Sequence, residues 1–341
     1  MNKSAPEKIV VIRFSSIGDI VLCTPVLRCL KKIPAKNIYV HFVTKKKYRS
    51  LVEHNPNIDR LHLLDGSLYG IIKKLKSEGV SAIIDLHNNL RSALVKMALR
   101  KPSGSFFKMN IEKWLLTAFK INRLPDKHIV DRYFDAASVA GVINDGEGLD
   151  FFFSDKSPEW PEELPEEFRQ GPVAFVIGGK HATKRLPDEK IISICKKLGP
   201  GIVLLGDSSD RNSGKVIAAA CGNGVFNGCG LFSLQQSAFI VRMADVVISH
   251  DTGLMHIAAA FRKRIVSVWG NTVPAFGMVP YMPGHPERSV IVEVKDLSCR
   301  PCTKIGYSKC PRGHFDCMKK IDEDKVVSAA REFILQQHKT A

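Results

Sequence analysis

The feature that most constrains this chain is a strand–loop–helix unit that repeats along most of its length. Apolar runs of strand length alternate with polar or glycine-bearing loops and with amphipathic helical segments. In the first half of the chain, strands are expected at 8–14, 37–43, 58–64 and 81–86. Because neighbouring parallel strands must be joined by a crossover, the alternation predicts an α/β fold with a doubly wound parallel sheet.

Helices are expected between these strands, at 20–32, 45–52, 69–79 and 88–100, and two more follow at 111–119 and 131–140. Pro25 lies inside the first helix. Because proline lacks the N–H that an interior helical position donates, this helix should kink or be limited to its later turns. Ligands of such a sheet bind beyond the carboxyl ends of its strands.

A segment rich in proline and acid, residues 155–171, separates two similar halves. It holds prolines at 158, 161 and 165 and six acidic residues, a composition typical of a linker. The pattern then restarts, with strands at 173–177, 202–205, 245–248 and 264–269 and helices at 189–198, 214–221, 234–243 and 322–337. We therefore expect an N-terminal domain at 1–157, a linker at 158–171, a C-terminal domain at 172–320, and a helix at 321–341 that packs back on the first domain.

The net charge of the chain restricts its partners. The 341 residues carry a formal net charge of +16, which favours nucleotides, phosphorylated glycans or an anionic membrane surface. A basic solvated surface without a dedicated partner is the competing explanation. Aromatic residues do not alternate with the basic clusters as a base-stacking surface requires, so we expect no nucleic-acid partner.

The sequence predicts a cytoplasmic protein. Residues 1–8 are polar, and the apolar run 9–12 is too short for a signal peptide. No stretch approaches the roughly 20 apolar residues of a membrane helix. The nine cysteines, an odd number and mostly scattered, are typical of reduced thiols rather than of a disulfide framework.

Residues 249–260 follow an apolar strand and open a helix of small residues. Such a loop binds anions, because free N–H groups and the positive end of the helix dipole point at the ligand. Asp251 and Thr252 can cap this helix, and Gly253 lets a phosphate approach the backbone. His256 can reach the same ligand from the first turn. An ordinary capped helix with a buried histidine explains the same residues.

A second candidate anion loop covers residues 178–187 and follows a strand. Two glycines, the Thr183 hydroxyl and three cations within ten residues suit a diphosphate. Lys184 or Arg185 can neutralise charge that grows on a departing nucleoside diphosphate. A solvated basic loop is the alternative.

The loop Ser15-Ser16-Ile17-Gly18-Asp19 follows the first strand. It lacks the G-x-G-x-x-G and G-x-x-x-x-G-K-[ST] patterns, which argues against a dehydrogenase or a P-loop NTPase. Asp19 stands at a helix start, where it can act as a general base toward a sugar hydroxyl or merely interact with the helix dipole. At the end of another strand, His87, Asn88 and Arg91 can bind an anionic acceptor.

Four cysteines gather near the end of the chain, at Cys299, Cys302, Cys310 and Cys317, with His314 nearby. They can hold a structural zinc ion, although the spacing is not that of a common zinc finger. Core thiols or a redox clip are the alternatives.

Taken together, these motifs make the chain resemble the lipopolysaccharide heptosyltransferases of glycosyltransferase family 9. The matching stretches are 12–19 with Thr24-Pro25, 85–92, 183–185, 251–259, 299–302 and 317–318. The resemblance implies a GT-B fold, with two Rossmann-like domains facing across a cleft. It also implies inverting transfer of a heptose-type sugar from an ADP-sugar donor to a lipopolysaccharide core or related glycolipid, without metal or cofactor.

The resemblance also implies roles for individual residues. Asp19 would be the general base, and Ser16 and Arg91 would lie toward the acceptor. Lys184 would stabilise the leaving diphosphate. The donor site would comprise Thr183, Lys184, Asp251, Thr252, Gly253, Leu254 and His256.

We expect a monomer that acts on an anionic glycolipid at the inner face of the cytoplasmic membrane, as a peripheral protein. Two alternatives remain open at this point. One is another nucleotide-sugar enzyme of the same fold, with a different glycosyl donor or with epimerase activity. The other is a sugar-nucleotide-binding module without catalysis.

Overall fold

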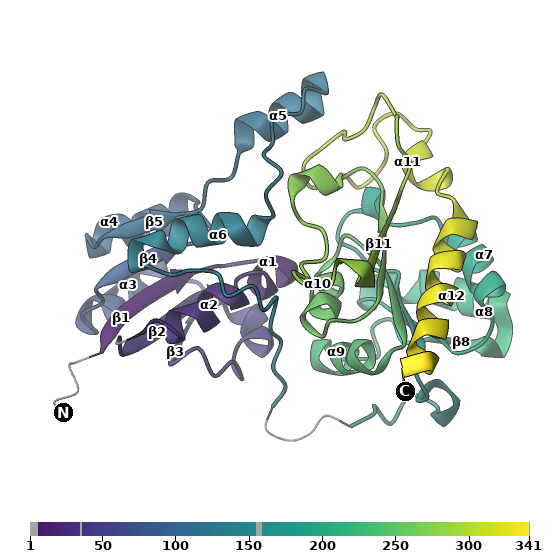
Figure 1. The fold of residues 1–341 in the computed structure, drawn as a ribbon, viewed down its shortest axis with the longest axis horizontal. Coiled ribbons are helices and arrows are strands. Elements are labelled where there is room, and N and C mark those ends of the chain that lie inside the picture. Colours follow the sequence, from purple (N-terminus) through teal and green to yellow (C-terminus); the bar gives the residue numbers. More distant parts are fainter. Residues whose placement is uncertain (1–5, 35, 155–158, 341) are drawn as a thin grey trace. The chain divides into compact units, whose positions relative to one another are not determined.

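The chain folds into two compact units (Figure 1). The computed structural model describes residues 6–34, 36–154 and 159–340. The first unit comprises Met1–Lys108 and Lys127–Lys156, and the second comprises Met109–Asp126 and Ser157–Ala341. In the described part of the chain, no helix is both long enough and apolar enough to cross a membrane.

A five-stranded parallel sheet forms the centre of the first unit. Its strands are β1 (Glu7–Ile12), β2 (Ile38–Lys45), β3 (Arg60–Leu64), β4 (Ala82–Asp85) and β5 (Ser103–Ser105). They lie in the order β3-β2-β1-β4-β5, and every pairing is parallel. The central strands are runs of β-branched residues buried on both faces, as parallel sheets require.

Helices cover both faces of this sheet. They are α1 (Ile17–Val21), α2 (Thr24–Lys31), α3 (Leu68–Ser77), α4 (Leu90–Leu99) and α6 (Ile129–Ala137), with 3-10 turns η1 (Lys46–Leu51) and η2 (Ser138–Ala140). Apolar side chains of α3 and α4 pack on the face that carries Val10 and Ile12. Helices α2 and α6 contact each other over the opposite face.

The second unit contains a six-stranded parallel sheet in the order β11-β10-β9-β6-β7-β8. Its strands are β6 (Val173–Val176), β7 (Ile202–Leu205), β8 (Val225–Asn227), β9 (Val246–His250), β10 (Ile265–Trp269) and β11 (Ser289–Glu293). Helices α7 (Asp188–Leu198), α8 (Arg211–Cys221) and α12 (Glu323–Thr340) pack into one apolar core, and α9 (Leu234–Met243) contacts α10 (Gly253–Ala260).

The second unit contains one further helix of ten residues, α5 (Asn110–Phe119), and several short elements. The short elements are α11 (Asp316–Lys319) and the 3-10 turns η3 (Glu166–Phe168), η4 (Ala182–Lys184), η5 (Ser208–Asp210), η6 (Gly222–Gly224), η7 (Pro274–Phe276) and η8 (Pro286–Arg288).

Both sheets have the strand order of a Rossmann fold. In each unit the chain starts at a central strand, winds to one edge, and returns to continue on the other side. The return creates a switch point between β1 and β4 in the first unit and between β6 and β9 in the second. Ligands of such sheets bind at these points. The predicted α/β class with two parallel sheets is confirmed.

Local structure differs from the sequence prediction in a few places. The helix expected at 20–32 is two helices, α1 and α2, and Pro25 lies in the first turn of α2, where its missing N–H costs nothing. The helix expected at 45–52 is the 3-10 turn η1. Strands β5, β8 and β11 were not expected: β5 and β8 have only three residues, and all three are edge strands in which at most one residue is buried.

The two compact units also divide the chain differently from the domains that the sequence suggested. Residues 109–126 group with the second unit, where Lys120 Nζ donates to the Pro301 carbonyl at 2.8 Å and Lys304 Nζ to Asn110 Oδ1 at 3.1 Å. The predicted boundary at 157/158 lies outside the described residues.

The final helix belongs to the second unit as well. Helix α12 packs on α7, β9, β10 and β11, whereas we expected it on the first domain. Its apolar side chains explain the difference: Val326, Val327, Ala330 and Phe333 are buried in the core of the second sheet.

A buried histidine fixes one strand end of the second sheet. His250, the last residue of β9, has no exposed surface, and its Nε2 accepts a hydrogen bond from the Leu186 N–H at 3.0 Å. The bond ties the loop after β6 to the end of β9. Burial, together with the Arg185 cation, lowers the pKa of His250 to about 4, so the imidazole is neutral at pH 7.

Gly104 in β5 tests the packing of the first unit. A Cβ at this position would lie 1.9 Å from the Ala136 carbonyl oxygen on α6. We expect Gly104→Ala to destabilise the first unit by about 1–3 kcal/mol, the usual cost of overpacking. The three tryptophans, at 114, 160 and 269, all lie in the second unit, so tryptophan fluorescence does not report on the first unit. The suitable measurement is therefore hydrogen exchange of peptides from β5 and α6.

Gly70 in α3 provides the matched control, because a Cβ there meets no heavy atom within 4 Å. Alanine is favoured over glycine in a helix by about 0.5–1 kcal/mol, so Gly70→Ala should slightly slow exchange. Equal exchange in the Gly104→Ala and Gly70→Ala proteins would contradict the close packing of β5 on α6.

His250 predicts a pH dependence of the second unit. An unfolded histidine takes up a proton as pH falls through about 6.5, whereas folded His250 stays neutral down to about 4. Stability present at pH 7.5 should therefore be lost progressively as pH falls between these two values. Urea unfolding followed by tryptophan fluorescence at pH 7.5 and 5.5 should show a smaller loss for His250→Gln than for the unaltered protein. The half-exposed His285, changed to Gln, serves as control and should leave the loss unchanged.

Candidate functional site

The candidate site of the second unit consists of loops that follow β6, β9 and β10. These parallel strands are neighbours in the sheet, so their carboxyl ends bring the loops together. The first loop carries residues 178–185, the second Asp251 and Thr252, and the third residues 270–272. The site lies at the switch point between β6 and β9.

An ion pair joins two of these loops. Lys184 Nζ lies 2.5 Å from Asp251 Oδ2, and the same oxygen accepts a hydrogen bond from Thr272 Oγ1 at 3.1 Å. The Lys184 and Asp251 side chains are only 16% and 10% exposed. The sequence predicted both residues for the donor site but not their contact. The pair holds an ammonium group beside the start of α10.

The N-terminus of α10 keeps its backbone donors available. Thr252 occupies the N-cap position, but its side chain makes no capping hydrogen bond and instead lies 3.2 Å from Ser249 Oγ. Asp251 is engaged by Lys184 rather than by the helix. The expectation that these two side chains cap the helix is therefore wrong. The first-turn N–H groups and the helix dipole remain suited to an anion.

Three other predicted donor-site residues have different environments. Thr183 is buried, and its hydroxyl accepts from the Tyr307 N–H at 2.8 Å and donates to the Tyr307 carbonyl at 3.2 Å. Thr183 thus anchors the loop that presents Lys184. Leu254 is partly exposed on the first turn of α10, while His256 is buried in the same helix.

Asp210 is a site residue that sequence reasoning missed. Its Oδ1 pairs with Arg185 Nη1 at 2.7 Å, and its Oδ2 accepts the Asp207 N–H at 2.9 Å. A Cβ on Gly178 would come within 2.4 Å of Asp210 Oδ2, so glycine is required for this close approach. The carboxylate thereby orients Arg185. The sequence signal that could have identified it is an acidic residue soon after the end of the next strand, β7.

The loop after β10, and Arg300 beyond β11, supply further residues that sequence reasoning missed. Arg300 donates from Nη2 to the Thr272 carbonyl at 2.9 Å and from Nε to the Gly270 carbonyl, and it pairs with Glu293 at 2.6 Å. Asn271 is 1% exposed, and its side-chain amide has no hydrogen-bond partner among the described residues. Arg300 therefore holds the backbone that places Thr272 against Asp251.

In the first unit, Asp19 lies in the first turn of α1, shortly after β1, and is held by a buried arginine. Arg13 Nη2 lies 2.5 Å from Asp19 Oδ1, and Oδ2 accepts from the Ser16 N–H at 3.0 Å and the Ser16 hydroxyl at 2.7 Å. Burial raises the pKa of Asp19, but the Arg13 guanidinium and the Ser16 hydrogen bonds lower it more, to about 2. Asp19 is therefore a carboxylate throughout the neutral range.

The surroundings of Arg13 explain why it stays in place. Its side chain is 8% exposed, and it donates to the Ser15 carbonyl at 2.8 Å and to the Leu86 carbonyl. Its guanidinium also lies 5.6 Å from the centre of the Tyr133 ring. These contacts join the loop after β1 to the loop after β4, so Arg13 links the two sides of the switch point.

The loop after β4 is organised by a buried acid. Asp85 accepts the backbone N–H groups of His87 at 3.0 Å and Asn88 at 2.7 Å, and it pairs with Lys96 at 3.0 Å. Burial and the Arg13 cation lower the pKa of His87 to about 4, so this ring is neutral at pH 7. Arg91 is exposed in the first turn of α4. Arg91 is thus the cation of this loop that is open to an anionic ligand.

The four C-terminal cysteines are all free thiols in the second unit. Cys299 and Cys302 line a cavity of about 360 Å³ together with residues 117–120. In the described ranges, the one group of three metal-binding side chains with ligand atoms within 4.8 Å of one another lies elsewhere, in the first unit. A zinc ion bound by these cysteines stays a prediction.

Comparison with known proteins identifies the family. A profile described as glycosyltransferase family 9 (heptosyltransferase) matches residues 68–310. The chain is 24% identical to lipopolysaccharide heptosyltransferase 1 of Campylobacter coli over 296 residues, which cover 78% of this chain and 84% of that protein.

Solved structures with a similar fold include a family 9 glycosyl transferase from Veillonella parvula, with a TM-score of 0.72 and 22% identity over 97% of both chains. Another is E. coli ADP-heptose LPS heptosyltransferase II, with a TM-score of 0.71 and 19% identity over 97% of this chain and 99% of that one. Because the family profile matches most of a chain with two Rossmann-like sheets, the protein belongs to glycosyltransferase family 9, the heptosyltransferases, and is a glycosyltransferase of the GT-B class.

Proposed function

We propose that the protein transfers a heptose from an ADP-heptose donor to a lipopolysaccharide core or related glycolipid, with inversion and without a metal ion. The observation that carries this proposal is the Lys184–Asp251 pair beside the open N-terminus of α10. The names of the relatives support the substrates: lipopolysaccharide heptosyltransferase in one case and ADP-heptose LPS heptosyltransferase in another.

The second unit holds the donor in this proposal. A nucleoside diphosphate gains negative charge as the bond to the sugar breaks, and cations or oriented N–H groups stabilise that charge. Lys184 and the first turn of α10 supply both kinds of group. Asp251 keeps the ammonium in place and is available to a sugar hydroxyl. Because protein groups neutralise the leaving diphosphate, this chemistry does not need a bound metal ion.

The first unit supplies the base. The acceptor oxygen attacks the anomeric carbon from the face opposite the departing ADP, so one displacement inverts the configuration. The hydroxyl proton passes to the Asp19 carboxylate. A carboxylate with a pKa near 2 is a weak base, and it suits a proton that leaves late, after the new C–O bond has made the oxygen strongly acidic. Arg13 keeps this carboxylate ionised and fixed.

Two substitutions separate the roles of base and donor site. Asp19→Asn should lower kcat by at least about 100-fold, the usual scale for a general base, while KM for ADP-heptose stays unchanged. Lys184→Ala should lower kcat/KM for the donor by about 100-fold or more, because a charge-stabilising group is lost. The measurements are ADP release and mass spectrometry of the glycolipid, with product NMR for the anomeric configuration.

Lys180 provides the control for Lys184, because it is an exposed cation of the same loop. Lys180→Ala should leave kcat/KM nearly unchanged, and added Mg²⁺ or Mn²⁺ should not alter the rate. Near-normal turnover of Asp19→Asn would exclude Asp19 as the base. Faster turnover with UDP- or GDP-sugars than with ADP-heptose would contradict the proposed donor.

In this proposal the glycolipid acceptor brings the enzyme to the cytoplasmic face of a membrane. Helix α5 offers a surface for this, because Ile111, Trp114 and Phe119 are 69%, 56% and 58% exposed. Two exposed cations, Lys120 and Arg123, lie at or just beyond its end. Exposed aromatic and aliphatic side chains beside cations, on a chain of net charge +16, fit an anionic lipid surface.

Vesicle binding tests this surface. Trp114→Ser should weaken binding to phosphatidylcholine vesicles that contain phosphatidylglycerol by about tenfold, since the transfer of a large side chain into lipid is lost. Binding should also fall as NaCl rises. The control is Val216→Ser on α8, a residue 56% exposed in the same unit. Unaltered vesicle binding of Trp114→Ser, or a self-association that only this variant loses, would contradict a lipid partner.

A further inference from the structure

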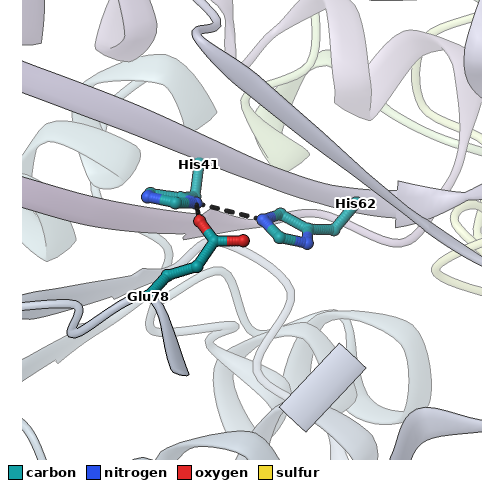
Figure 2. A group of neighbouring side chains, drawn as sticks. All are labelled: His41, His62 and Glu78. Atoms are coloured by element: carbon teal, nitrogen blue, oxygen red, sulfur yellow. Dashed lines mark hydrogen bonds and ion pairs between the residues drawn. The ribbon is translucent and has the colours of Figure 1, made fainter. Parts of the chain in front are cut away.

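Two histidines and a glutamate meet inside the first unit, away from its strand-end loops. Figure 2 shows His41 of β2, His62 of β3 and Glu78, which caps the C-terminus of α3. His41 has no exposed surface, His62 is 5% exposed, and the Glu78 side chain is 13% exposed. None of the three belongs to the motifs of the transfer site.

The three side chains converge on one point. His41 Nδ1 lies 3.0 Å from His62 Nε2 and 3.1 Å from Glu78 Oε2, and the three ligand atoms lie within 4.8 Å of one another. A neutral imidazole has at most one proton on Nδ1, so one hydrogen bond cannot satisfy both neighbours equally. A cation between the three atoms would engage the lone pairs of all of them.

The position in the sheet separates this cluster from the candidate site. His41 is paired in register with Arg60, the first residue of β3, and Lys8, near the start of β1, donates to the Glu78 carbonyl at 2.7 Å. The cluster therefore lies in the amino-terminal half of the sheet, under the end of α3. Asp19 and Asp85 lie at or beyond the carboxyl ends of the strands.

We propose that His41, His62 and Glu78 form a binding site for a divalent transition-metal ion, with zinc as the best-suited ion. Two imidazole nitrogens and one carboxylate oxygen are a ligand set that zinc accepts, with a water as fourth ligand. Tetrahedral zinc with bonds of about 2.0–2.1 Å separates its ligands by about 3.3 Å. The separations of 3.0 and 3.1 Å would need to widen by a few tenths of an ångström, and the third, between His62 and Glu78 and no longer than 4.8 Å, would need to approach the same value.

The charges around the cluster allow such an ion. Arg60 Nε lies 3.1 Å from Glu78 Oε1, the oxygen that faces away from His41, and leaves Oε2 to the site. Lys8 is engaged by the Glu78 carbonyl, and the C-terminal end of the α3 dipole favours a cation. A surface cavity of about 420 Å³ is lined by His62, Arg60 and Lys74. The cavity gives water and metal ions a route to the histidine.

A metal ion here would connect three elements that are far apart in the sequence. It would fasten the edge strand β3 and the end of α3 to β2, and so stabilise the first unit by its binding free energy. It would take no part in glycosyl transfer. The proposal is thus independent of the donor, the acceptor and the base assigned above.

The experiment uses the full-length protein, stripped with a chelator and titrated with zinc or cobalt. Zinc should bind tightly enough to protect β2, β3 and α3 from hydrogen exchange. His62→Gln and Glu78→Gln should each weaken binding by at least about tenfold, because one ligand is lost or changed. Bound Co²⁺ should show the d–d absorption of a tetrahedral nitrogen and oxygen site, without charge transfer from thiolate.

Two controls make the test specific. His54→Gln removes a partly exposed histidine of the same unit and should leave zinc binding unchanged. Cys299→Ser with Cys302→Ser removes thiols that compete for the metal and should not alter protection of β2 and β3. If one of the two glutamine variants does not fold in the presence of chelator, zinc binding by the other variant still tests the proposal. Unchanged affinity in a folded variant, or protection confined to residues 299–317, would overturn the proposal.

Discussion

The ion pair between Lys184 and Asp251 is the contact around which the candidate site of the second unit is built. It joins residues 67 positions apart in the sequence, at the ends of neighbouring parallel strands β6 and β9. The surrounding contacts serve to hold it: Thr183 anchors the Lys184 loop to Tyr307, His250 ties Leu186 to β9, and Thr272 fixes Asp251. Because the Lys184 ammonium is already held in place, the site needs little rearrangement to stabilise the diphosphate of the proposed donor.

The first unit also holds a charged side chain near the end of a strand, but here the charge is negative. Its central carboxylate, Asp19, is held by Arg13, which also contacts the carbonyls of the loops after β1 and β4. Burial alone would favour a protonated acid, and the arginine reverses that preference. In both units, then, a strand-end charge is paired with its opposite at the switch point of a Rossmann-like sheet. The pairing holds each group in place without removing it from a ligand.

Much of this arrangement could be predicted from the sequence, because parallel strands and crossover helices leave strong periodic signals. Asp19, Lys184 and Asp251 were predicted as site residues because each lies shortly after an apolar run of strand length, and their roles stay predictions. Thr272, Asp210 and Arg300 were missed, since their roles come from contacts between loops that no local pattern records. Strands β5 and β8 were missed because three-residue segments such as Ser103–Ser105 become strands only through their neighbours. The final helix, α12, was predicted to pack on the first domain but packs on the second unit, since an amphipathic face does not specify its partner.

The proposed transfer without a metal ion and the proposed metal site are physically compatible in one chain. In the proposed transfer, Lys184 and the N-terminus of α10 supply the positive charge beside the diphosphate, so the proposal needs no oxygen-ligand cage for magnesium. The cluster of His41, His62 and Glu78 offers nitrogen ligands, which magnesium disfavours and zinc accepts. It also lies in the half of the sheet where Rossmann-like proteins do not bind substrates. The two proposed features therefore have different roles. The groups at the carboxyl ends of the strands provide charge for the transfer, and the metal site near the amino ends cross-links the edge strand β3.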